Sequence, residues 1–338
     1  MVLARKYILS RHFKGLPKAD DLKLVEEELP PLKEGQFLSE AVYFSVDPFL
    51  RAYNPLQPLG STMLGNQVAK IIKSKNSKYP EGKYIYGAYG WRTHTIGPKQ
   101  LEEDALGYKE QEYLLPDFGN LPLSLGLGML GMPGNTAYFG FLELCKPKEG
   151  ETVVVTAAAG AIGSHVGQIA KIKKCRVIGI AGSDEKGKWL TEELGFDSFI
   201  NYKKPGLLEN LKAAAPNGID CYFDNVGGEI SSIVISQMNS FGRIAVCGAI
   251  TSYNSDITNM PKATMIQGFL ILKQLKLEGY YVFRWIDRWM EGINQNLQWI
   301  KEGKLKYRET VTEGFENLLP ALIDLLNGGN VGKAIVKA

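Results

Sequence analysis

Metal-binding residues are scarce in this sequence. Its 338 residues include only 3 histidines, namely His12, His94 and His165. None of them has metal-ligand spacing to a cysteine or an acidic residue, and the motifs H-E-x-x-H and G-x-S-x-G are both absent. His165 falls within a predicted helix, where a packing role is more common than a chemical one. We therefore expect no metal and no serine-hydrolase chemistry.

Cysteine and long apolar runs are also scarce. The 4 cysteines are widely separated, and no pair has the C-x-x-C spacing of a zinc ribbon or a redox pair. Reduced and mostly buried thiols fit a reducing compartment such as the cytosol. No stretch reaches the roughly 18 apolar residues that a membrane-spanning helix requires, and the N-terminus lacks the apolar core of a signal peptide. We expect a cytoplasmic protein that does not enter a membrane.

Neither sign of charge predominates in the composition. The chain has 39 lysines and arginines against 36 aspartates and glutamates, a formal net charge of +3. The basic residues are scattered rather than gathered into a stripe, which argues against a nucleic-acid partner. A small molecule is the partner that we expect.

The first part of the chain, up to about residue 120, has short apolar runs separated by proline and glycine, which predicts a strand-rich domain of irregular barrel type. Strands are predicted over 36–46, 67–72 and 84–91. The many prolines make long helices unfavourable there. A terminal strand at 331–337 would rejoin this domain and make it discontinuous.

From Glu151 onward, apolar strands alternate with segments of helical length. The run TVVVT (152–156) is rich in β-branched residues and suits a strand buried on both faces. Ser183 or Asp184 can cap a later helix, which Gly195 ends. Helices are predicted over 161–173 and 284–301, and further strands over 176–181, 198–201, 218–223 and 243–247. This alternation predicts an α/β fold with a Rossmann-type, doubly wound parallel sheet.

A glycine-containing turn is the strongest local motif. The segment AAAGAIGSHVGQIA (157–170) follows the TVVVT strand directly and leads into a helix, which is the context of a dinucleotide fingerprint. Gly160 and Gly163 take the second and third glycine places of G-x-G-x-x-G, with Ala158 at the first. Gly160 allows close backbone approach, and Gly163 allows tight packing of helix on strand. The helix N-terminus would then bind a pyrophosphate.

The end of the second strand distinguishes NAD from NADP. NAD enzymes usually place an acidic residue there, which binds the ribose 2′-hydroxyl. This chain has Gly182 and Ser183 at that corner, followed by Asp184, Glu185 and Lys186. An acid at the corner would repel a 2′-phosphate, whereas small residues followed by a lysine accept one. The alternative is that the two acids only begin a helix and the lysine is a solvated surface charge. On position alone the two interpretations are close, and we favour NADPH.

Two further segments follow predicted strands at the same carboxyl edge of the sheet, where ligands of open α/β sheets bind. Asn225, within Asp-Asn-Val-Gly-Gly (224–228), can hydrogen-bond a cofactor ribose, although a simple turn is about equally plausible. The segment Cys-Gly-Ala-Ile (247–250) can line the nicotinamide end. Without a Lewis acid, an isolated carbonyl is hard to polarise. A conjugated carbonyl is easier to reduce, because hydride adds to the β-carbon and the charge spreads into an enolate that needs only hydrogen-bond donors and a proton.

These motifs carry a resemblance that runs essentially from end to end. The sequence resembles the prostaglandin reductases, also called NADP-dependent leukotriene B4 12-hydroxydehydrogenases, of the zinc-independent medium-chain dehydrogenase/reductase family. Matching stretches are VDP (46–48), GNQVAK (65–70), GMPGNTAYFG (131–140), AAAGAIGS (157–164), GSDEK (182–186), NYK (201–203), CYFDNVGG (221–228), FGRIAVCGAI (241–250) and GFEN (314–317).

The resemblance implies a division of the chain and an activity. Residues 1–122 and 304–338 would form a discontinuous, β-rich GroES-like substrate and catalytic domain, and residues 123–303 a Rossmann domain that binds NADPH. Family members are commonly cytoplasmic homodimers. They reduce 15-oxo-prostaglandins, 4-hydroxynonenal-type enals and other enones.

The resemblance also implies individual cofactor contacts. The glycine turn would hold the pyrophosphate, while Lys186 and Tyr202 would bind the 2′-phosphate. Residues 280–282 would lie by the nicotinamide, and Asn330 would reach it from the C-terminal strand. The full set is Gly160, Ala161, Ile162, Gly163, Lys186, Tyr202, Asn225, Cys247, Gly248, Ala249, Ile250, Thr251, Ser252, Tyr253, Tyr280, Tyr281, Val282 and Asn330.

Three places differ from related proteins. Zinc-dependent relatives carry Gly-His-Glu where this chain has Gly-Asn-Gln (65–67), which supports metal independence. Leu272 stands where close relatives often have a tyrosine, and leucine cannot donate a hydrogen bond. Either Tyr253, a ribose hydroxyl of the cofactor or water would then supply the proton, or the activity would be reduced, and no catalytic residue is assigned. Phe49 also stands where relatives often have a tyrosine, a difference that bears on substrate preference.

Three functions remain under consideration at this point. The leading one is NADPH-dependent reduction of the conjugated carbon–carbon double bond of enones and enals. The second is NADP-dependent oxidation of an allylic alcohol such as leukotriene B4. The third is a non-catalytic NADPH-binding protein, which would bind the cofactor tightly and turn over no enal.

Overall fold

The structure, a computed structural model, describes residues 2–99, 111–255 and 258–338. The chain forms two compact units. The first comprises Met1–Gly128 and Glu309–Ala338, and the second comprises Met129–Arg308. Within the described ranges, no helix combines the length and apolar character needed to cross a bilayer.

The second unit is built on a six-stranded sheet in which all strands run parallel. The strands are β8 (Thr152–Thr156), β9 (Arg176–Ala181), β10 (Ser198–Asn201), β11 (Ile219–Asp224), β12 (Met238–Val246) and β13 (Lys276–Gly279). Their order across the sheet is β10-β9-β8-β11-β12-β13. This is the 3-2-1-4-5-6 order of the Rossmann fold. The predicted doubly wound parallel sheet is confirmed.

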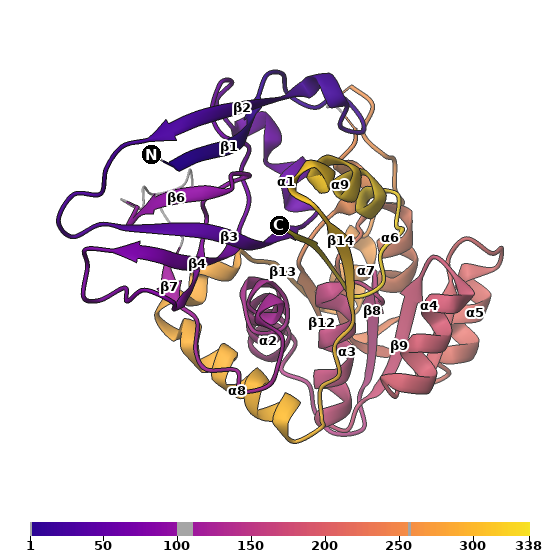
Figure 1. Cartoon of the computed structure of the whole chain (residues 1–338). Coiled ribbons are helices and arrows are strands. Elements are labelled where there is room, and N and C mark those ends of the chain that lie inside the picture. Colours follow the sequence, from indigo (N-terminus) through magenta and orange to yellow (C-terminus); the bar gives the residue numbers. More distant parts are fainter. Residues whose placement is uncertain (1, 100–110, 256–257) are drawn as a thin grey trace. The chain divides into compact units, whose positions relative to one another are not determined.

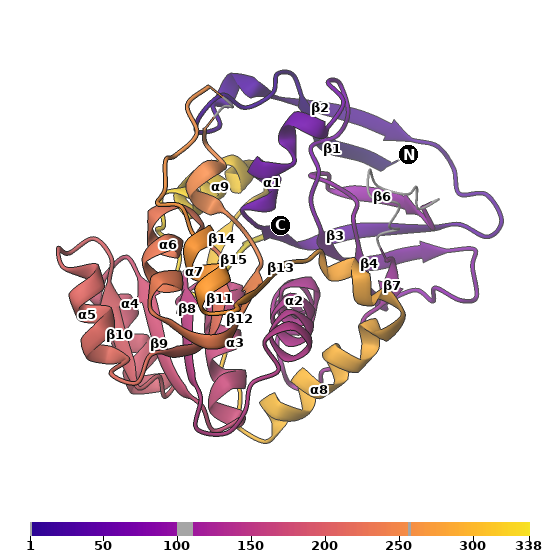
Figure 2. The ribbon, with the colours of Figure 1, turned by 180° about the vertical axis from the view of Figure 1, so that it is seen from behind.

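Helices cover both faces of this sheet. They are α2 (Met132–Phe139), α3 (Ala161–Ile172), α4 (Asp184–Lys188), α5 (Leu207–Ala214), α6 (Gly228–Ser236) and α7 (Gln267–Leu272), and α8 (Trp289–Lys301) packs on α2. Figure 1 shows α2 and α3 in front of the sheet, and Figure 2 shows α6 and α7 on the opposite face. On that opposite face, Leu211 of α5 and Val234 of α6 pack against Ile178 and Ile244 of the sheet in one apolar cluster. The β-branched strands predicted from sequence are therefore buried on both faces.

Short non-α helices complete the second unit. The π-helix η4 (Gly140–Cys145) continues α2, and the π-helix η5 (Trp189–Glu193) continues α4. Two 3-10 helices lie in later connections. η6 (Ile250–Ser252) follows β12, and η7 (Val282–Arg288) follows β13. The helix predicted over 284–301 is thus wrong in its first turn: residues 284–288 belong to η7, which contains a non-helical kink at Trp285 (φ −111°, ψ 32°), and α8 begins only at Trp289.

The first unit is rich in antiparallel strands. A two-stranded sheet pairs β1 (Val2–Leu9) with β2 (Leu22–Leu29). A seven-stranded sheet has the order β14-β15-β3-β4-β5-β7, with β6 also paired to β3. Its strands are β3 (Phe37–Val46), β4 (Gln67–Ser74), β5 (Tyr84–Gly87), β6 (His94–Gly97), β7 (Tyr113–Leu114), β14 (Glu309–Glu313) and β15 (Lys333–Lys337). The strand predicted over 84–91 ends at Gly87, and the chain then turns, with Gly90 in the left-handed region (φ 77°).

The C-terminus returns to this unit, as the sequence predicts. β15 pairs antiparallel with β3, with Ala334 opposite Val46. Short helices fill the connections: η1 (Ala19–Asp21), α1 (Phe49–Ala52), η2 (Asn54–Leu56), η3 (Leu123–Leu127), η8 (Phe315–Asn317) and α9 (Leu318–Leu326). The β-rich domain is therefore discontinuous in sequence.

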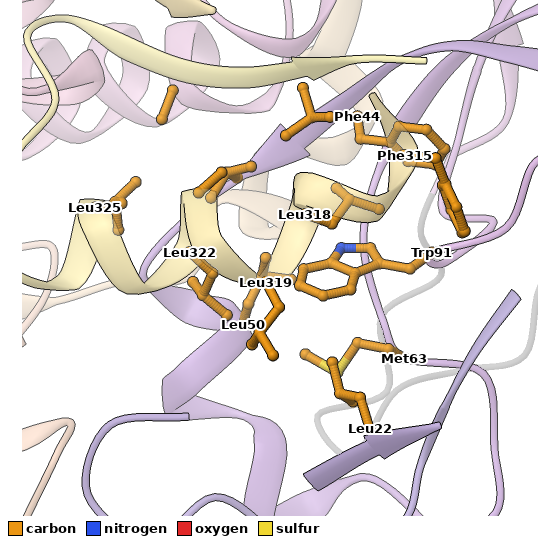
Figure 3. Packing of buried hydrophobic residues seen from close by; sticks show 14 of the residues in the cluster. Leu22, Phe44, Leu50, Met63, Trp91, Phe315, Leu318, Leu319, Leu322 and Leu325 are labelled. Atoms are coloured by element: carbon orange, nitrogen blue, oxygen red, sulfur yellow. The ribbon is translucent and has the colours of Figure 1, made fainter. Parts of the chain in front are cut away.

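The core of the first unit lies between α9 and the strands. Figure 3 shows the indole of Trp91 beside Leu318 and Leu319 of α9, with Met63 in the same cluster. Trp91 is completely buried. Burial of each large apolar side chain stabilises a fold by about 1.5 to 3 kcal/mol. The C-terminal segment therefore contributes directly to the stability of a unit formed mostly by the N-terminal residues.

Candidate cofactor site

A sharp turn joins β8 to α3 at the carboxyl edge of the parallel sheet. Ala157 takes a left-handed conformation (φ 48°), and the amide of Gly160 donates to the carbonyl of Ala157 at 2.9 Å. Gly160 is the N-cap of α3 in extended conformation, and no side chain caps the helix. The first N–H groups of a helix have no intrahelical acceptor. The N–H groups around Ala161 and Ile162 are thus available to an anion.

The two glycines of the turn serve different purposes. A methyl group added at Gly163 would lie 2.4 Å from the carbonyl oxygen of Ala157, so helix and strand touch here. A methyl group at Gly160 would meet only that same oxygen, at 3.2 Å. Gly163 is therefore required for packing, whereas Gly160 leaves the space above the helix end open. The turn fits a pyrophosphate, which helix N-termini bind through their N–H groups and dipole.

The corner after β9 begins α4 with a capped turn. The Ser183 hydroxyl accepts from the backbone N–H of Lys186 at 3.3 Å. Asp184 directs its carboxylate away from this cap, to Lys204 Nζ at 2.7 Å and Asn201 Nδ2 at 2.9 Å. These hydrogen bonds, that of Lys204 first, lower the pKa of Asp184. The acid closest to the corner is thus already neutralised by a lysine.

Two residues of the segment after β10 cover Gly182. A methyl group built at Gly182 would lie 3.1 Å from the ring and hydroxyl of Tyr202 and 3.2 Å from Lys203 Cε. The structure therefore brings Tyr202 to the corner where the sequence places the 2′-phosphate. It adds Lys203, which sequence reasoning did not select. The signal for Lys203 was only its place beside Tyr202 in Asn-Tyr-Lys (201–203).

The turn after β11 is tied to the end of β8. Asn225 donates from Nδ2 to the Thr156 carbonyl at 2.7 Å, and its backbone N–H donates to Thr156 Oγ1 at 3.0 Å. Gly227 and Gly228 have positive φ angles of 70° and 64°, a conformation that favours glycine. With the amide nitrogen engaged, no group of the described residues donates to Asn225 Oδ1, which can accept a ligand hydroxyl or amide.

The segment after β12 folds back on this turn. Thr251 donates to the Val226 carbonyl through both its amide, at 3.2 Å, and its hydroxyl, at 2.7 Å. The backbone N–H of Ala249 donates to the Tyr253 hydroxyl at 3.2 Å. A methyl group at Gly248 would lie 2.9 Å from that hydroxyl. Residues 247–253, including Ile250 and Ser252 of η6, thus form one wall beside the turn after β11.

Two titratable side chains in this wall are held in their neutral forms. Burial raises the pKa of Cys247 to about 12, and burial also raises the pKa of Tyr253. The Tyr253 hydroxyl accepts a hydrogen bond from a backbone amide, so its own proton is directed elsewhere. A protonated phenol at this edge of the sheet is suited to donate a hydrogen bond or a proton.

The remaining predicted contacts divide between the units. In the second unit, Tyr280 donates to the Thr136 carbonyl at 2.8 Å, while Val282 is buried and Tyr281 half-buried. The hydroxyl of Tyr280 is therefore engaged within the protein. Asn330 belongs to the first unit, where its Nδ2 donates to the Gly332 carbonyl at 2.8 Å. Its contact with the cofactor stays a prediction.

The histidine and amide residues weighed as metal ligands have other partners. His165 is fully buried, and its Nε2 hydrogen-bonds Asn296 Oδ1 at 3.1 Å. Burial lowers its pKa to about 4. Asn66 donates to the Tyr86 hydroxyl at 2.7 Å, and Gln67 donates to the Gly90 carbonyl at 2.7 Å. Across the three described ranges, no three histidine, cysteine, aspartate or glutamate side chains gather as a metal site would require.

The sheet order, the uncapped glycine turn and the neutralised corner define a protein of the Rossmann dinucleotide-binding class. Residues 5–103 match a family model described as the N-terminal domain of oxidoreductase, and residues 161–300 match one described as zinc-binding dehydrogenase. Prostaglandin reductase 1 of Bos taurus is 51% identical over 342 residues, which cover 100% of both chains. The chain belongs to the prostaglandin reductase family of medium-chain dehydrogenases/reductases.

Two further relatives extend the comparison. The NADPH-dependent curcumin reductase of Escherichia coli (strain K12) is 36% identical over 345 residues, covering 98% of this chain and 96% of the relative. The crystal structure of CurA from Vibrio vulnificus in complex with NADPH superposes with a TM-score of 0.89 at 35% identity, covering 99% of each chain.

Proposed function

We propose that this chain is an NADPH-dependent reductase of the conjugated carbon–carbon double bond in α,β-unsaturated ketones and aldehydes. The observation that carries this is the end-to-end identity of 51% with prostaglandin reductase 1. A curcumin reductase that uses NADPH and an NADPH-bound structural relative point the same way. When bound, NADPH supplies the hydride that adds to the β-carbon of the substrate.

The residues of the second unit would bind and orient the cofactor. The N–H groups at the start of α3 would hold the pyrophosphate, and Asn225 with residues 247–253 would face the nicotinamide half. Lys186, Tyr202 and Lys203 would surround the 2′-phosphate. The pairing of Asp184 with Lys204 at 2.7 Å removes the repulsion that this carboxylate would otherwise exert.

The preference for NADPH is tested at Lys186. We expect Lys186→Ala to raise the KM for NADPH about tenfold, because a charged hydrogen bond to the phosphate is lost, and to leave the KM for NADH nearly unchanged. Lys188→Ala, an exposed lysine in the same helix, is the matched control and should change neither value. Steady-state kinetics with both cofactors measure the effect. Equal changes in KM for NADPH and NADH would show that Lys186 does not bind the 2′-phosphate.

Tyr253 is the residue that we propose as proton donor to the α-carbon. Its hydroxyl accepts from the Ala249 N–H, which leaves the phenolic proton for the substrate. Leu272, at the position where close relatives often have a tyrosine, cannot donate and is 82% exposed at the end of α7. The proton therefore has to come from another group.

Removing the Tyr253 hydroxyl should slow the reaction. We expect Tyr253→Phe to lower kcat about ten- to a hundredfold, within the range of general acid catalysis, a larger effect than any rise in the Kd for NADPH. Comparing kcat with a cofactor titration separates the two effects. An unchanged kcat would assign protonation to water or a ribose hydroxyl.

The reaction class is tested with a panel of enals, enones and 15-oxo-prostaglandins, each with NADPH and NADH. We expect NADPH to be consumed with saturation of the conjugated double bond, and expect simple unconjugated ketones to be inert. Reduction of NADP with an allylic alcohol and no turnover of enones would indicate the dehydrogenase direction. Tight NADPH binding without turnover of any substrate would indicate a non-catalytic protein.

The division of labour along the chain is also part of the proposal. Residues 123–303 would form the NADPH-binding domain, and residues 1–122 with 304–338 the GroES-like substrate and catalytic domain. The compact units, Met129–Arg308 and the remainder, support this division. A cytoplasmic location is supported by the thiols, since all four cysteines are free and three of them are buried.

We propose a second copy of this chain as the protein partner. β13 is an edge strand, and apolar side chains near it are exposed: Met265, Ile271 and Leu272 by 78%, 74% and 82%. Exposed apolar residues beside an open sheet edge favour strand pairing between subunits. Light scattering should therefore give twice the chain mass of 37.4 kDa. A monomer at micromolar concentration would contradict the dimer.

A further inference from the structure

A buried carboxylate stands at the end of β11, next to the residues assigned to cofactor binding. Asp224 is only 3% exposed. Its Oδ1 accepts from the Tyr222 hydroxyl at 2.8 Å and from the backbone N–H groups of Val226 and Gly227, both at 2.9 Å. Its Oδ2 accepts from the Ser231 hydroxyl of α6 at 2.6 Å. A buried charge is costly unless it is well hydrogen-bonded, and four donors lie within 2.9 Å of this one.

The same residue joins the ends of neighbouring strands. The Asp224 carbonyl accepts from the backbone N–H groups of Cys247, at 2.8 Å, and Gly248, at 3.1 Å, just after β12. On the other side, Thr156 Oγ1 at the end of β8 lies 3.4 Å from Asp224 Oδ1 and receives the Asn225 amide at 3.0 Å. Asp224 therefore fixes the turn after β11 relative to both flanking strands.

The strand order shows which half of a dinucleotide these segments would face. β9 and β11 lie on opposite sides of β8, and the turn after β8 would hold the pyrophosphate. The corner after β9, with Gly182 and Tyr202, would then face the adenosine half. The nicotinamide half would extend over β11 and β12, which are the two strands whose ends Asp224 connects.

We propose that Asp224 is a positioning residue for the nicotinamide half of NADPH: it holds the Asn225–Gly228 turn and the start of the 247–253 segment in their binding geometry. This inference rests on the proposed function. Asp224 acts through Asn225 and the backbone of residues 247–253 and has no contact with the adenosine corner. Hydrogen bonds to an ionised acceptor are about twice as strong as neutral ones, which is why a carboxylate suits this position better than an amide.

The same strand offers a matched control at its other end. Asp220 accepts from the Thr152 amide at 2.8 Å and from Asn239 Nδ2 at 2.8 Å. Asp224→Asn and Asp220→Asn make the same chemical change and remove a carboxylate from the same strand, although Asp220 is half-buried and accepts fewer hydrogen bonds. Only Asp224 lies at the carboxyl edge.

The experiment measures the Kd of two ligands by calorimetry for the wild type and both variants. The ligands are NADPH and adenosine 2′,5′-bisphosphate, which carries the adenosine half without the nicotinamide. For Asp224→Asn we expect the Kd of NADPH to rise about tenfold, because the charge-assisted hydrogen bonds to the turn are weakened, while the Kd of the bisphosphate changes less than about twofold. Asp220→Asn should change neither Kd, even if both variants unfold at a lower temperature.

Any other result contradicts either the role inferred for Asp224 or the proposed function on which that role rests. If Asp224→Asn weakens both ligands equally, the residue supports the fold in general and the inference is wrong; it is also wrong if neither Kd changes. If the wild type fails to bind NADPH, the proposed function itself fails. Should Asp224→Asn not fold, Ser231→Ala and Tyr222→Phe each remove one donor to the carboxylate, and both should weaken NADPH selectively by a smaller factor.

Discussion

Replacing Gly163 by alanine is expected to abolish useful NADPH binding and to destabilise the second unit. The added methyl group would lie 2.4 Å from the Ala157 carbonyl oxygen and 2.8 Å from Ala158 Cα. Both are backbone atoms of the phosphate turn, so the turn itself must move. Overpacking of this kind costs about 1 to 3 kcal/mol, and a displacement near 1 Å of binding groups weakens their function about a hundredfold.

Two other glycines, one at the N-cap of α3 and one in its middle, provide controls that separate binding from stability. At Gly160 a methyl group meets only the Ala157 oxygen, at 3.2 Å, so Gly160→Ala should fold normally yet bind NADPH weakly. At Gly167 it would strike the ring of Phe196 at 1.9 Å, inside the helix and away from the turn. Gly167→Ala should therefore lower stability with a smaller effect on NADPH affinity. Thermal unfolding and cofactor titration measure both properties, and normal NADPH affinity in Gly163→Ala would contradict the proposed turn.

Replacing Lys333 by methionine is expected to destabilise the first unit by about 3 to 5 kcal/mol, the cost of leaving a buried charge without its partner. Lys333 is 4% exposed on β15. Its Nζ donates to the carbonyls of Val46 and Ala334 at 2.7 and 2.8 Å and to Asp47 Oδ1 at 3.0 Å. Burial lowers the pKa of Lys333, and the charge of Asp47 opposes that shift. Methionine fills the space but removes the ammonium group from Asp47, whose carboxylate keeps the hydrogen bond from the Ser45 hydroxyl.

The same strand contains the control for this prediction. Lys337 pairs with Glu313 at 3.5 Å, and both side chains are largely exposed. Lys337→Met should cost less than about 1 kcal/mol. Adding Asp47→Asn to Lys333→Met removes the unpaired charge and should recover part of the loss. Urea unfolding measures all four proteins, and a loss below about 1 kcal/mol for Lys333→Met would show that the pair contributes little.

Most of the second unit could be predicted from the sequence because most of its strands are short, continuous runs of apolar and β-branched residues. The runs at 152–156, 176–181 and 198–201 coincide with β8, β9 and β10. β12 begins at Met238, well before the predicted 243. The prediction missed its first residues because they are partly polar and because Phe241 interrupts the extended backbone with a left-handed conformation (φ 63°). Apolar periodicity cannot detect a strand that is interrupted in this way.

The candidate site was predictable only where one short segment contains the whole motif. The glycine turn meets that condition, since strand, glycines and helix are contiguous. The role of Asp224 could not be predicted in this way, because its partners Thr156, Ser231 and Cys247 lie in separate segments that only the folded parallel sheet brings together. The pairing of Asp184 with Lys204 likewise depends on the adjacency of β9 and β10. Long-range hydrogen bonds between strand ends leave no periodic trace in the sequence.

The destination of the hydride is the most direct test of the function assigned to this family member. NADPH deuterated at the transferable position would be incubated with an enone, and the product analysed by mass spectrometry and NMR. We expect one deuterium at the β-carbon of a saturated ketone and a solvent proton at the α-carbon. Deuterium on the carbonyl carbon of an allylic alcohol, or no transfer at all, would contradict the account.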